Sequence, residues 1–134
     1  MRLHHTIVPE VSAHCDLPCG VYDPAQARIE AVSVKACIEK YHGSDDEVFK
    51  ARALNIKEER SDLVKHHLWV LWTDYFKPPH FEKYPHLHQL FNEATKLAGG
   101  GGGTKSSLDV AVADQLLAKI DEIAVIFAET KKAA

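Results

Sequence analysis

The residues best suited to chemistry lie close together near the N-terminus, in the string HCDLPCGVY at positions 14–22. Cys15 and Cys19 offer two sulfur ligands and His14 offers an imidazole. A proline and a glycine in the same string favour a tight reversal of the chain, so all three side chains could reach one metal ion. The Cys-x₃-Cys spacing is not that of zinc sites or of thioredoxin-type redox motifs. The spacing alone leaves three interpretations open: a metal site, a pair of free thiols, or a small local disulfide.

The rest of the chain carries apolar residues at alternating steps of three and four, the spacing of amphipathic helices. Helices are predicted over positions 23–42, 44–76 and 85–97, and a fourth begins near position 110. The residues expected to face the core are Ala27, Ala31, Val34, Ile38, Tyr41, Val64, Leu68, Leu71, Tyr75, Leu87, Leu90, Phe91, Ala94, Leu97, Val110, Ala113, Leu117, Ile120, Ala124 and Phe127. Strand-type alternation is absent. The predicted fold class is therefore all-α, an antiparallel four-helix bundle with an irregular N-terminal segment.

Two connections between the predicted helices have unusual sequences. The segment KPPHFEKYP at 77–85 is rich in proline and aromatic residues and predicts a loop. Five consecutive glycines at 99–103 would cost too much backbone entropy in a helix, and they predict a flexible connection. A bundle is only a scaffold, so the function must come from a site placed on it.

Length and charge narrow the classes of protein. The chain has 134 residues, enough for one domain, and a net charge of −3 gives no general attraction to nucleic acid or to an anionic membrane. No apolar run approaches the roughly 20 residues of a transmembrane helix. Residues 1–13 lack the continuous apolar stretch of a secretory signal, so this leader is not expected to direct export. These features predict a cytoplasmic protein that binds neither nucleic acid nor membranes.

The string at 14–22 resembles the nickel-binding hook of the nickel superoxide dismutases, whose mature chains begin HCDLPCGVY. The likeness covers nearly everything from His14 to the end of the chain, and its fold is the four-helix bundle already predicted. It continues through DPAQARIEA at 23–31, KHH at 65–67, DYFKPPHFEKYP at 74–85, LHQL at 87–90 and ETKKA at 129–133. The resemblance implies an enzyme that disproportionates superoxide to dioxygen and hydrogen peroxide by cycling between Ni(II) and Ni(III).

The resemblance also implies how the nickel ligands arise. In that family a pro-segment is removed, so here a processing protease would cut between Ala13 and His14 and leave residues 14–134 as a single domain. One nickel ion per subunit would be held by the new His14 amine, the amide nitrogen of Cys15 and the thiolates of Cys15 and Cys19. The His14 imidazole would bind axially in the oxidised state. Members of the family assemble as hexamers, which implies a homohexamer here.

Matching positions imply further site residues. Glu30 and Arg60 match residues that hold the axial imidazole in its orientation, a usual task for groups behind a ligand histidine. Arg60 shares an apolar repeat of the second helix, where an unpaired charge is costly, so it is expected to pair with Glu30. The alternative is an Arg60 side chain turned to solvent. Tyr22 and Tyr75 resemble tyrosines that flank the substrate's approach, although tyrosines also pack as ordinary amphipathic residues. Asp16 supports the site from within the hook.

Several other polar residues receive weaker roles. Lys77 is a candidate for attracting the superoxide anion. Histidines 66, 67, 80, 86 and 88 do not share helix faces in a way that predicts a second metal site, so packing, loop hydrogen bonds or solvent exposure are expected for them. Cys37 matches no role in the family pattern and is expected to be a small buried hydrophobic residue.

Two other functions fit the same hook. A non-catalytic helical bundle could sequester or deliver nickel or copper through it. A thiol redox enzyme could instead cycle a Cys15–Cys19 disulfide without any metal.

Overall fold

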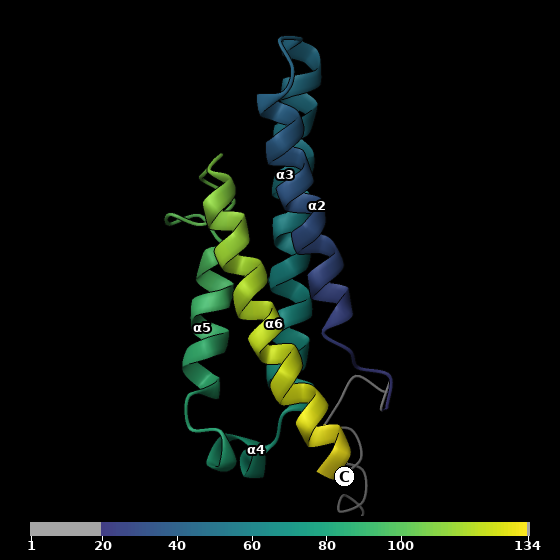
Figure 1. Cartoon of the computed structure of the whole chain (residues 1–134), viewed down its shortest axis with the longest axis vertical. Coiled ribbons are helices and arrows are strands. Elements are labelled where there is room, and N and C mark those ends of the chain that lie inside the picture. Colours follow the sequence, from purple (N-terminus) through teal and green to yellow (C-terminus); the bar gives the residue numbers. More distant parts are fainter. Residues whose placement is uncertain (1–19, 134) are drawn as a thin grey trace, which may run out of the picture.

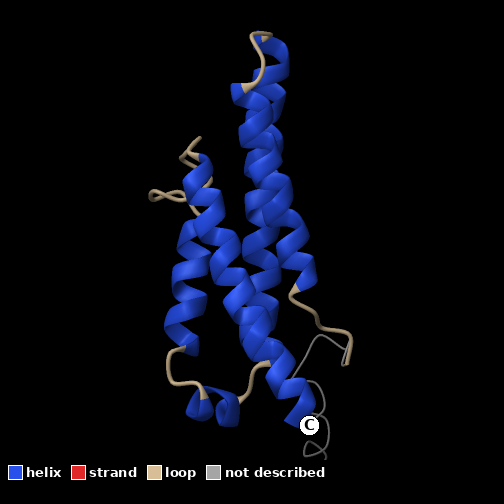
Figure 2. Ribbon diagram, in the orientation of Figure 1, coloured by secondary structure: helices blue, strands red, loops and turns tan. Residues whose placement is uncertain are grey.

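The computed structural model describes residues 20–133, which fold largely into helices (Figure 2). The elements are α2 (Ala25–His42), α3 (Glu47–Val70), the π-helical turn η2 (Leu71–Tyr75), α4 (Pro78–Lys83), α5 (Leu87–Leu97) and α6 (Val110–Ala133). No strand occurs between residues 20 and 133. None of the helices in this range combines the length and apolar character that a membrane span requires.

The four long helices form an antiparallel bundle. Helix α2 packs against α3, α3 against α5, α5 against α6, and α6 against α2. The chain runs up α2, down α3, up α5 and down α6, and the α2–α3 pair extends beyond the other two helices at its upper end (Figure 1). The predicted all-α four-helix bundle is confirmed.

Aspartates begin three of the helices at or near the predicted positions. Asp23, Asp46 and Asp109 each accept a hydrogen bond from the backbone N–H two residues further on, at 2.8, 3.0 and 2.9 Å. This bond satisfies one of the N–H groups that have no partner within the helix. The second predicted helix ends where it was predicted to end, since Phe76 adopts an extended conformation. Its last turn, however, is the π-helical η2 and not a regular α-helical turn.

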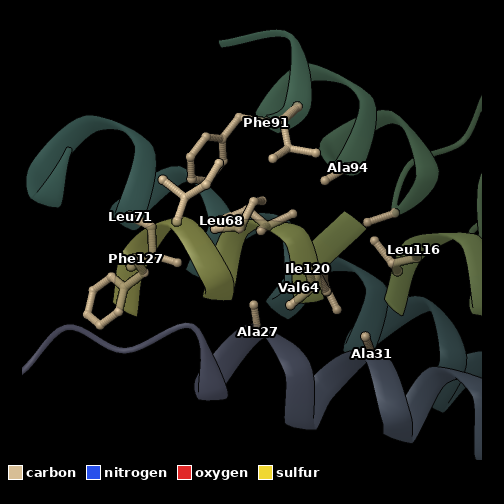
Figure 3. Close-up of a cluster of buried hydrophobic side chains, with 14 of the residues drawn as sticks. Ala27, Ala31, Val64, Leu68, Leu71, Phe91, Ala94, Leu116, Ile120 and Phe127 are labelled. Carbon is tan, nitrogen blue, oxygen red and sulfur yellow. The ribbon is translucent and has the colours of Figure 1, made fainter. Parts of the chain in front are cut away.

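The core is built from all four long helices (Figure 3). Most of the predicted core positions are buried there, including Ala27 and Ala31 of α2 and Phe91 and Ala94 of α5. Other labelled members of this cluster are Val64, Leu68, Leu71, Leu116, Ile120 and Phe127.

The prediction for the last helix was wrong in part. Leu116 and Ile123 of α6 are fully buried, whereas the predicted Leu117 and Ala124 are only partly buried. Both sets of residues repeat at steps of three and four along α6, so periodicity alone does not distinguish them. Packing against α2 and α5 selects the Leu116 side.

The proline-rich connection at 77–85 is also more regular than predicted. Pro78–Lys83 form the short helix α4. Pro78 and Pro79 stand at its first positions, where a backbone N–H has no partner within the helix and a proline is therefore tolerated.

The five-glycine segment is a loop, as predicted, and it is packed at both ends: Gly99 and Gly103 are buried, whereas the three glycines between them are exposed. Gly102 has φ +86°, a conformation that favours glycine. Gly103 is buried, and a Cβ atom there would lie 2.7 Å or less from the carbonyl oxygens of Lys96, Leu97 and Gly99. The loop returns onto the end of α5, because the N–H of Thr104 donates to the Leu97 carbonyl at 2.7 Å.

A buried lysine holds the other side of this loop. The Lys57 Nζ atom on α3 donates to the backbone carbonyls of Thr104, Lys105 and Ser107, at 2.5, 3.2 and 3.0 Å. One helical turn further on, the hydroxyls of Ser61 and Thr104 share a hydrogen bond of 2.7 Å. Lys57, Ser61 and Thr104 are all buried. Buried polar contacts therefore attach the end of this loop to the inward face of α3.

Candidate metal centre

The described chain begins one residue after Cys19, at the end of the bundle where α4 and the C-terminus also lie (Figure 1). Gly20 has φ +88°, the left-handed conformation that favours glycine, and it redirects the chain toward the start of α2. His14, Cys15, Asp16 and Cys19 lie outside the described residues. The leader and its predicted cleavage point lie outside them as well.

Tyr22 and Tyr75 contact each other beside this entry point. Their ring centroids are 6.2 Å apart and the rings meet edge to face at 62°. The Thr130 hydroxyl donates to the Phe127 carbonyl at 2.7 Å, so the Tyr75 hydroxyl, 2.7 Å away, donates to Thr130. Both tyrosines are partly buried against the core. The structure therefore brings the two predicted tyrosines together, close to where the hook joins the bundle.

Glu30 and Arg60 form the expected ion pair. Arg60 Nη1 on α3 donates to Glu30 Oε1 on α2 at 3.0 Å. The Glu30 side chain is only 15% exposed, whereas that of Arg60 is 43% exposed. Arg60 flanks the buried face of α3, which Ala53, Lys57 and Ser61 form, and does not lie on it as predicted. A carboxylate accepts several hydrogen bonds, so Glu30 retains capacity for a further donor.

His67 lies on the same face of α3, two helical turns after Arg60. Burial lowers the pKa of His67 below its ordinary value, the neighbouring His66 lowers it further, and the negative charge of Glu30 opposes both effects. The sequence analysis gave this residue no role at the metal site. Its electrostatic contact with Glu30 depends on the α2–α3 packing.

His80 and Lys131 contact the Tyr75 ring. The His80 ring stacks on the Tyr75 ring with centroids 5.8 Å apart, and its Nδ1 accepts the backbone N–H of Lys77 at 3.0 Å. Burial and the charge of Lys77 lower the pKa of His80, which favours the neutral ring that can accept that bond. The Lys131 ammonium lies 5.4 Å from the centre of the Tyr75 ring. Lys77 was predicted near the substrate's approach, whereas Lys131 was not.

The thiol within the described residues is poorly suited to bind a metal. Cys37 on α2 is partly rather than fully buried. Burial raises the pKa of its thiol, and the nearby Arg60 only partly offsets this, so the thiolate that a metal requires is disfavoured. Between residues 20 and 133 there is no group of three or more His, Cys, Asp or Glu side chains arranged to hold a metal ion.

The donor chemistry of the hook fits nickel. Two thiolates together with nitrogen donors suit Ni(II) or Cu(II) better than they suit ions that prefer oxygen ligands. The described residues near the entry of the hook include a largely buried carboxylate held by an arginine and a pair of tyrosines in contact. Groups of this kind commonly orient the ligands of a metal site.

Known proteins resemble this chain along nearly its whole length. The model of the family described as nickel-containing superoxide dismutase matches residues 9–131. The superoxide dismutase [Ni] of Streptomyces coelicolor is 62% identical over 123 residues, and that of Streptomyces seoulensis is 61% identical over 124 residues. Each match covers 92% of this chain and 92% of the relative.

A solved structure described as native nickel superoxide dismutase has the same fold. It is similar to this chain with a TM-score of 0.83 and 60% identity. The match covers 89% of this chain and 99% of the solved chain. The solved chain is therefore shorter than this one, whereas the two Streptomyces sequences are about as long.

Proposed function

The chain belongs to the nickel-containing superoxide dismutase family, and on that premise we propose that His14, Cys15 and Cys19 hold its nickel ion. The protein is an oxidoreductase that disproportionates superoxide to dioxygen and hydrogen peroxide, with nickel as its cofactor. One observation carries the assignment of the site: the string HCDLPCGVY at 14–22 leads directly into the end of the bundle that carries the Tyr22–Tyr75 and Glu30–Arg60 pairs.

The proposed ligands explain why this protein would choose nickel. When bound, nickel supplies one-electron chemistry by alternating between Ni(II) and Ni(III). The thiolates of Cys15 and Cys19 and the deprotonated amide of Cys15 donate negative charge, which favours the higher oxidation state. The amine and imidazole of His14 add nitrogen donors of the kind that suits this metal.

Glu30 and Arg60 are proposed to position the imidazole of His14. The Glu30 carboxylate would accept the N–H of the ring nitrogen that does not bind the metal, a common way to fix the orientation of a ligand histidine. Arg60 holds Glu30 from the other side, at 3.0 Å. Asp16 is proposed to support the hook from within. These residues act on the ligand and do not touch the substrate.

Tyr22 and Tyr75 are proposed to line the route of superoxide. Their phenol groups narrow the approach, and in the proposed mechanism Tyr22 contacts the substrate. The Lys131 ammonium lies 5.4 Å from the centre of the Tyr75 ring, and the Lys77 ammonium donates to the carbonyl of Asp74, the residue before Tyr75. Both cations favour an approaching anion. The reaction also consumes protons, which hydroxyl groups at the mouth can pass on from solvent.

Removal of residues 1–13 is proposed as the step that completes the ligand set. Before a cut between Ala13 and His14, the nitrogen of His14 is part of a peptide bond and is a poor donor. The lengths of the relatives support this step, because the solved chain is matched over 99% of its length by only 89% of this one. The mature protein is proposed to act in the cytoplasm as a homohexamer. Exposed apolar residues such as Ile29, 63% exposed, and Val125, 60% exposed, support association between subunits.

The decisive experiment compares two forms of the protein. The chain that begins at His14 and the chain that begins at Met1 are each incubated with Ni(II), and both nickel content and the rate of superoxide decay are measured. We expect tight binding and fast decay only for the shorter form. Nickel binding without faster decay would indicate a storage or delivery protein. Decay that needs a reductant and no metal would indicate a thiol enzyme. Equal activity of the two forms would contradict the role of the His14 amine.

A further inference from the structure

A continuous line of aromatic rings leads from the entry of the hook across the lower end of the bundle. Tyr22 contacts Tyr75 at 6.2 Å between ring centroids, and Tyr75 contacts Phe76 at 5.0 Å. Phe76 contacts Phe91 at 5.6 Å, and Phe91 is stacked on Trp72 at 6.2 Å and 17°. Tyrosine and tryptophan are the side chains most easily oxidised by one electron after cysteine, and the phenylalanine rings bridge the gap between them.

The far end of this line has a built-in proton acceptor. The Trp72 indole Nε1 donates a hydrogen bond of 3.0 Å to Nδ1 of the exposed His88. The His88 ring is held in place by stacking on Phe81, with centroids 3.8 Å apart and planes within 3°. An oxidised indole becomes strongly acidic, so its N–H proton can move to His88 as the electron leaves. Trp72 can therefore lose an electron without positive charge building up on the indole, because the charge passes to the imidazole of His88.

Tyr75 has no such acceptor at its hydroxyl. It donates to Thr130, whose own proton is already donated to the Phe127 carbonyl. A hydroxyl is a far weaker base than an imidazole, so loss of an electron from Tyr75 is not stabilised by proton transfer. An oxidising equivalent that reaches Tyr75 is therefore expected to move on to Trp72.

We infer that this line of rings carries oxidising equivalents from the nickel hook to the Trp72–His88 pair, and that Trp72 is the site where the protein takes up oxidative damage. The inference rests on the proposed nickel site, which places an oxidant beside Tyr22. That oxidant is hydrogen peroxide, the product of the enzyme's own reaction. Two electrons and two protons convert one peroxide to two waters. The electrons come from the Trp72 indole, which releases the two protons and gains one oxygen atom from water.

This transfer of oxidising equivalents along the rings, called the relay below, would protect the metal ligands. The thiolates of Cys15 and Cys19 are the groups in the hook that peroxide would otherwise oxidise to sulfinic and sulfonic acids, and those products do not revert. An oxygen atom on Trp72, at the edge of the bundle, leaves the ligands intact. The line of rings thus diverts damage from the residues that the reaction needs.

Trp69 provides an internal control. It lies one helical turn before Trp72 and its side chain is 45% exposed, whereas Trp72 is partly buried against the core. Among residues 20–133, Trp69 contacts no ring of this line. Peroxide that attacks from solvent should therefore modify Trp69 at least as readily as Trp72, whereas oxidation through the relay should favour Trp72.

The test uses the nickel-loaded chain that begins at His14, treated with hydrogen peroxide, digested, and sequenced by tandem mass spectrometry. Both tryptophans fall in one tryptic peptide, residues 66–83, because trypsin does not cut between Lys77 and Pro78, so fragment ions compare them directly. We expect added oxygen on Trp72 to exceed that on Trp69 several-fold, and this preference to vanish in nickel-free protein. Equal labelling of the two residues, or a preference that persists without nickel, would overturn the relay. Superoxide decay by untreated protein is measured in parallel. If it is absent, the proposed nickel site fails, and if it is present without the preference, only the relay fails.

Two variants, Trp72→Phe and His88→Asn, test the same inference independently, with Trp69→Phe as the control. Trp72→Phe should shift added oxygen onto Cys15 and Cys19 and shorten the survival of activity in peroxide several-fold, whereas Trp69→Phe should change neither. His88→Asn, which keeps a polar side chain but removes the base, should reduce the labelling of Trp72. Circular dichroism checks that each variant retains its helices. Unchanged cysteine oxidation in folded Trp72→Phe would contradict the relay.

Discussion

In the proposed site, two cysteine side chains determine what the hook can do, because thiolate charge would favour the oxidised metal. Replacing Cys15 or Cys19 by serine keeps the size of the side chain but substitutes a neutral hydroxyl. We expect each variant to lose nickel-dependent activity, measured as superoxide decay per bound nickel. Cys37→Ser is the matched control and should retain activity, since Cys37 is a partly buried thiol on α2 whose pKa is raised by burial. Substantial turnover by Cys15→Ser or Cys19→Ser would contradict the proposed donor set.

The Glu30–Arg60 pair is a second test at the level of single residues. Arg60→Met removes the donor 3.0 Å from Glu30 and leaves that carboxylate, 15% exposed, free to turn. Loss of a group that orients a metal ligand typically reduces metal affinity or activity about 10-fold or more. We expect such a loss in nickel affinity, measured by competition with a chelator. Arg28→Met breaks a similar pair with Asp121, at 2.8 Å, and should have no such effect. An equal effect of both variants would indicate a general change in surface charge.

Helix α3 carries a prediction about the glycine loop. Lys57→Met keeps the length of the side chain but leaves the carbonyls of residues 104, 105 and 107 without their donor. Unsatisfied buried polar groups cost about 1–3 kcal/mol, so we expect the free energy of unfolding to fall by about that amount in urea denaturation. Lys65→Met, on the same helix beside the loop, is the control. If Lys57→Met is as stable as the control, water replaces the ammonium and the loop does not depend on it.

The turn from η2 to α4 carries a prediction about pH. Burial and Lys77 lower the pKa of His80, so the folded protein holds it neutral at a pH where the unfolded chain takes up a proton. The unfolded state therefore binds more protons as the pH falls below about 6.5, and stability decreases there. We expect His80→Gln to reduce this loss between pH 7.5 and 5.5 in urea denaturation. His86→Gln, at an exposed position, should leave the loss unchanged. An identical pH dependence of His80→Gln and the wild type would contradict the assignment.

The elements differ in how far the sequence predicts them. Asp23 and Asp46 mark helix starts that the structure confirms, because an aspartate before a helix satisfies the first N–H groups locally. The packing of α6 was less predictable, since Leu116 and Leu117 both fit helical spacing. The way the glycine loop is attached to α3 was not predictable at all. It depends on Lys57, more than forty residues earlier in the chain.

At the scale of the whole molecule, the candidate site combines local and distant information. The hook is a local string, and its spacing alone allowed a metal site, free thiols or a disulfide, so the prediction of nickel came from resemblance. The Glu30–Arg60 pair was expected for the same reason and is present. Lys131 and His67 join the surroundings of the site only because α6 and α3 pack where they do, which no local pattern indicates.

The proposed assembly predicts which face of the molecule meets other subunits. Ile29 and Val32 of α2 are 63% and 45% exposed and line a shallow apolar groove close to the entry of the hook. Such a surface is costly to leave in water but becomes favourable when another subunit covers it. We expect Ile29→Asp to convert the mature, nickel-loaded protein to smaller species in light scattering coupled to size exclusion, because a buried unpaired carboxylate opposes association. Val48→Asp is the matched control: Val48 is 71% exposed near the start of α3, at the opposite end of the bundle. If Ile29→Asp keeps the mass of the wild type, this groove lies outside the subunit contacts.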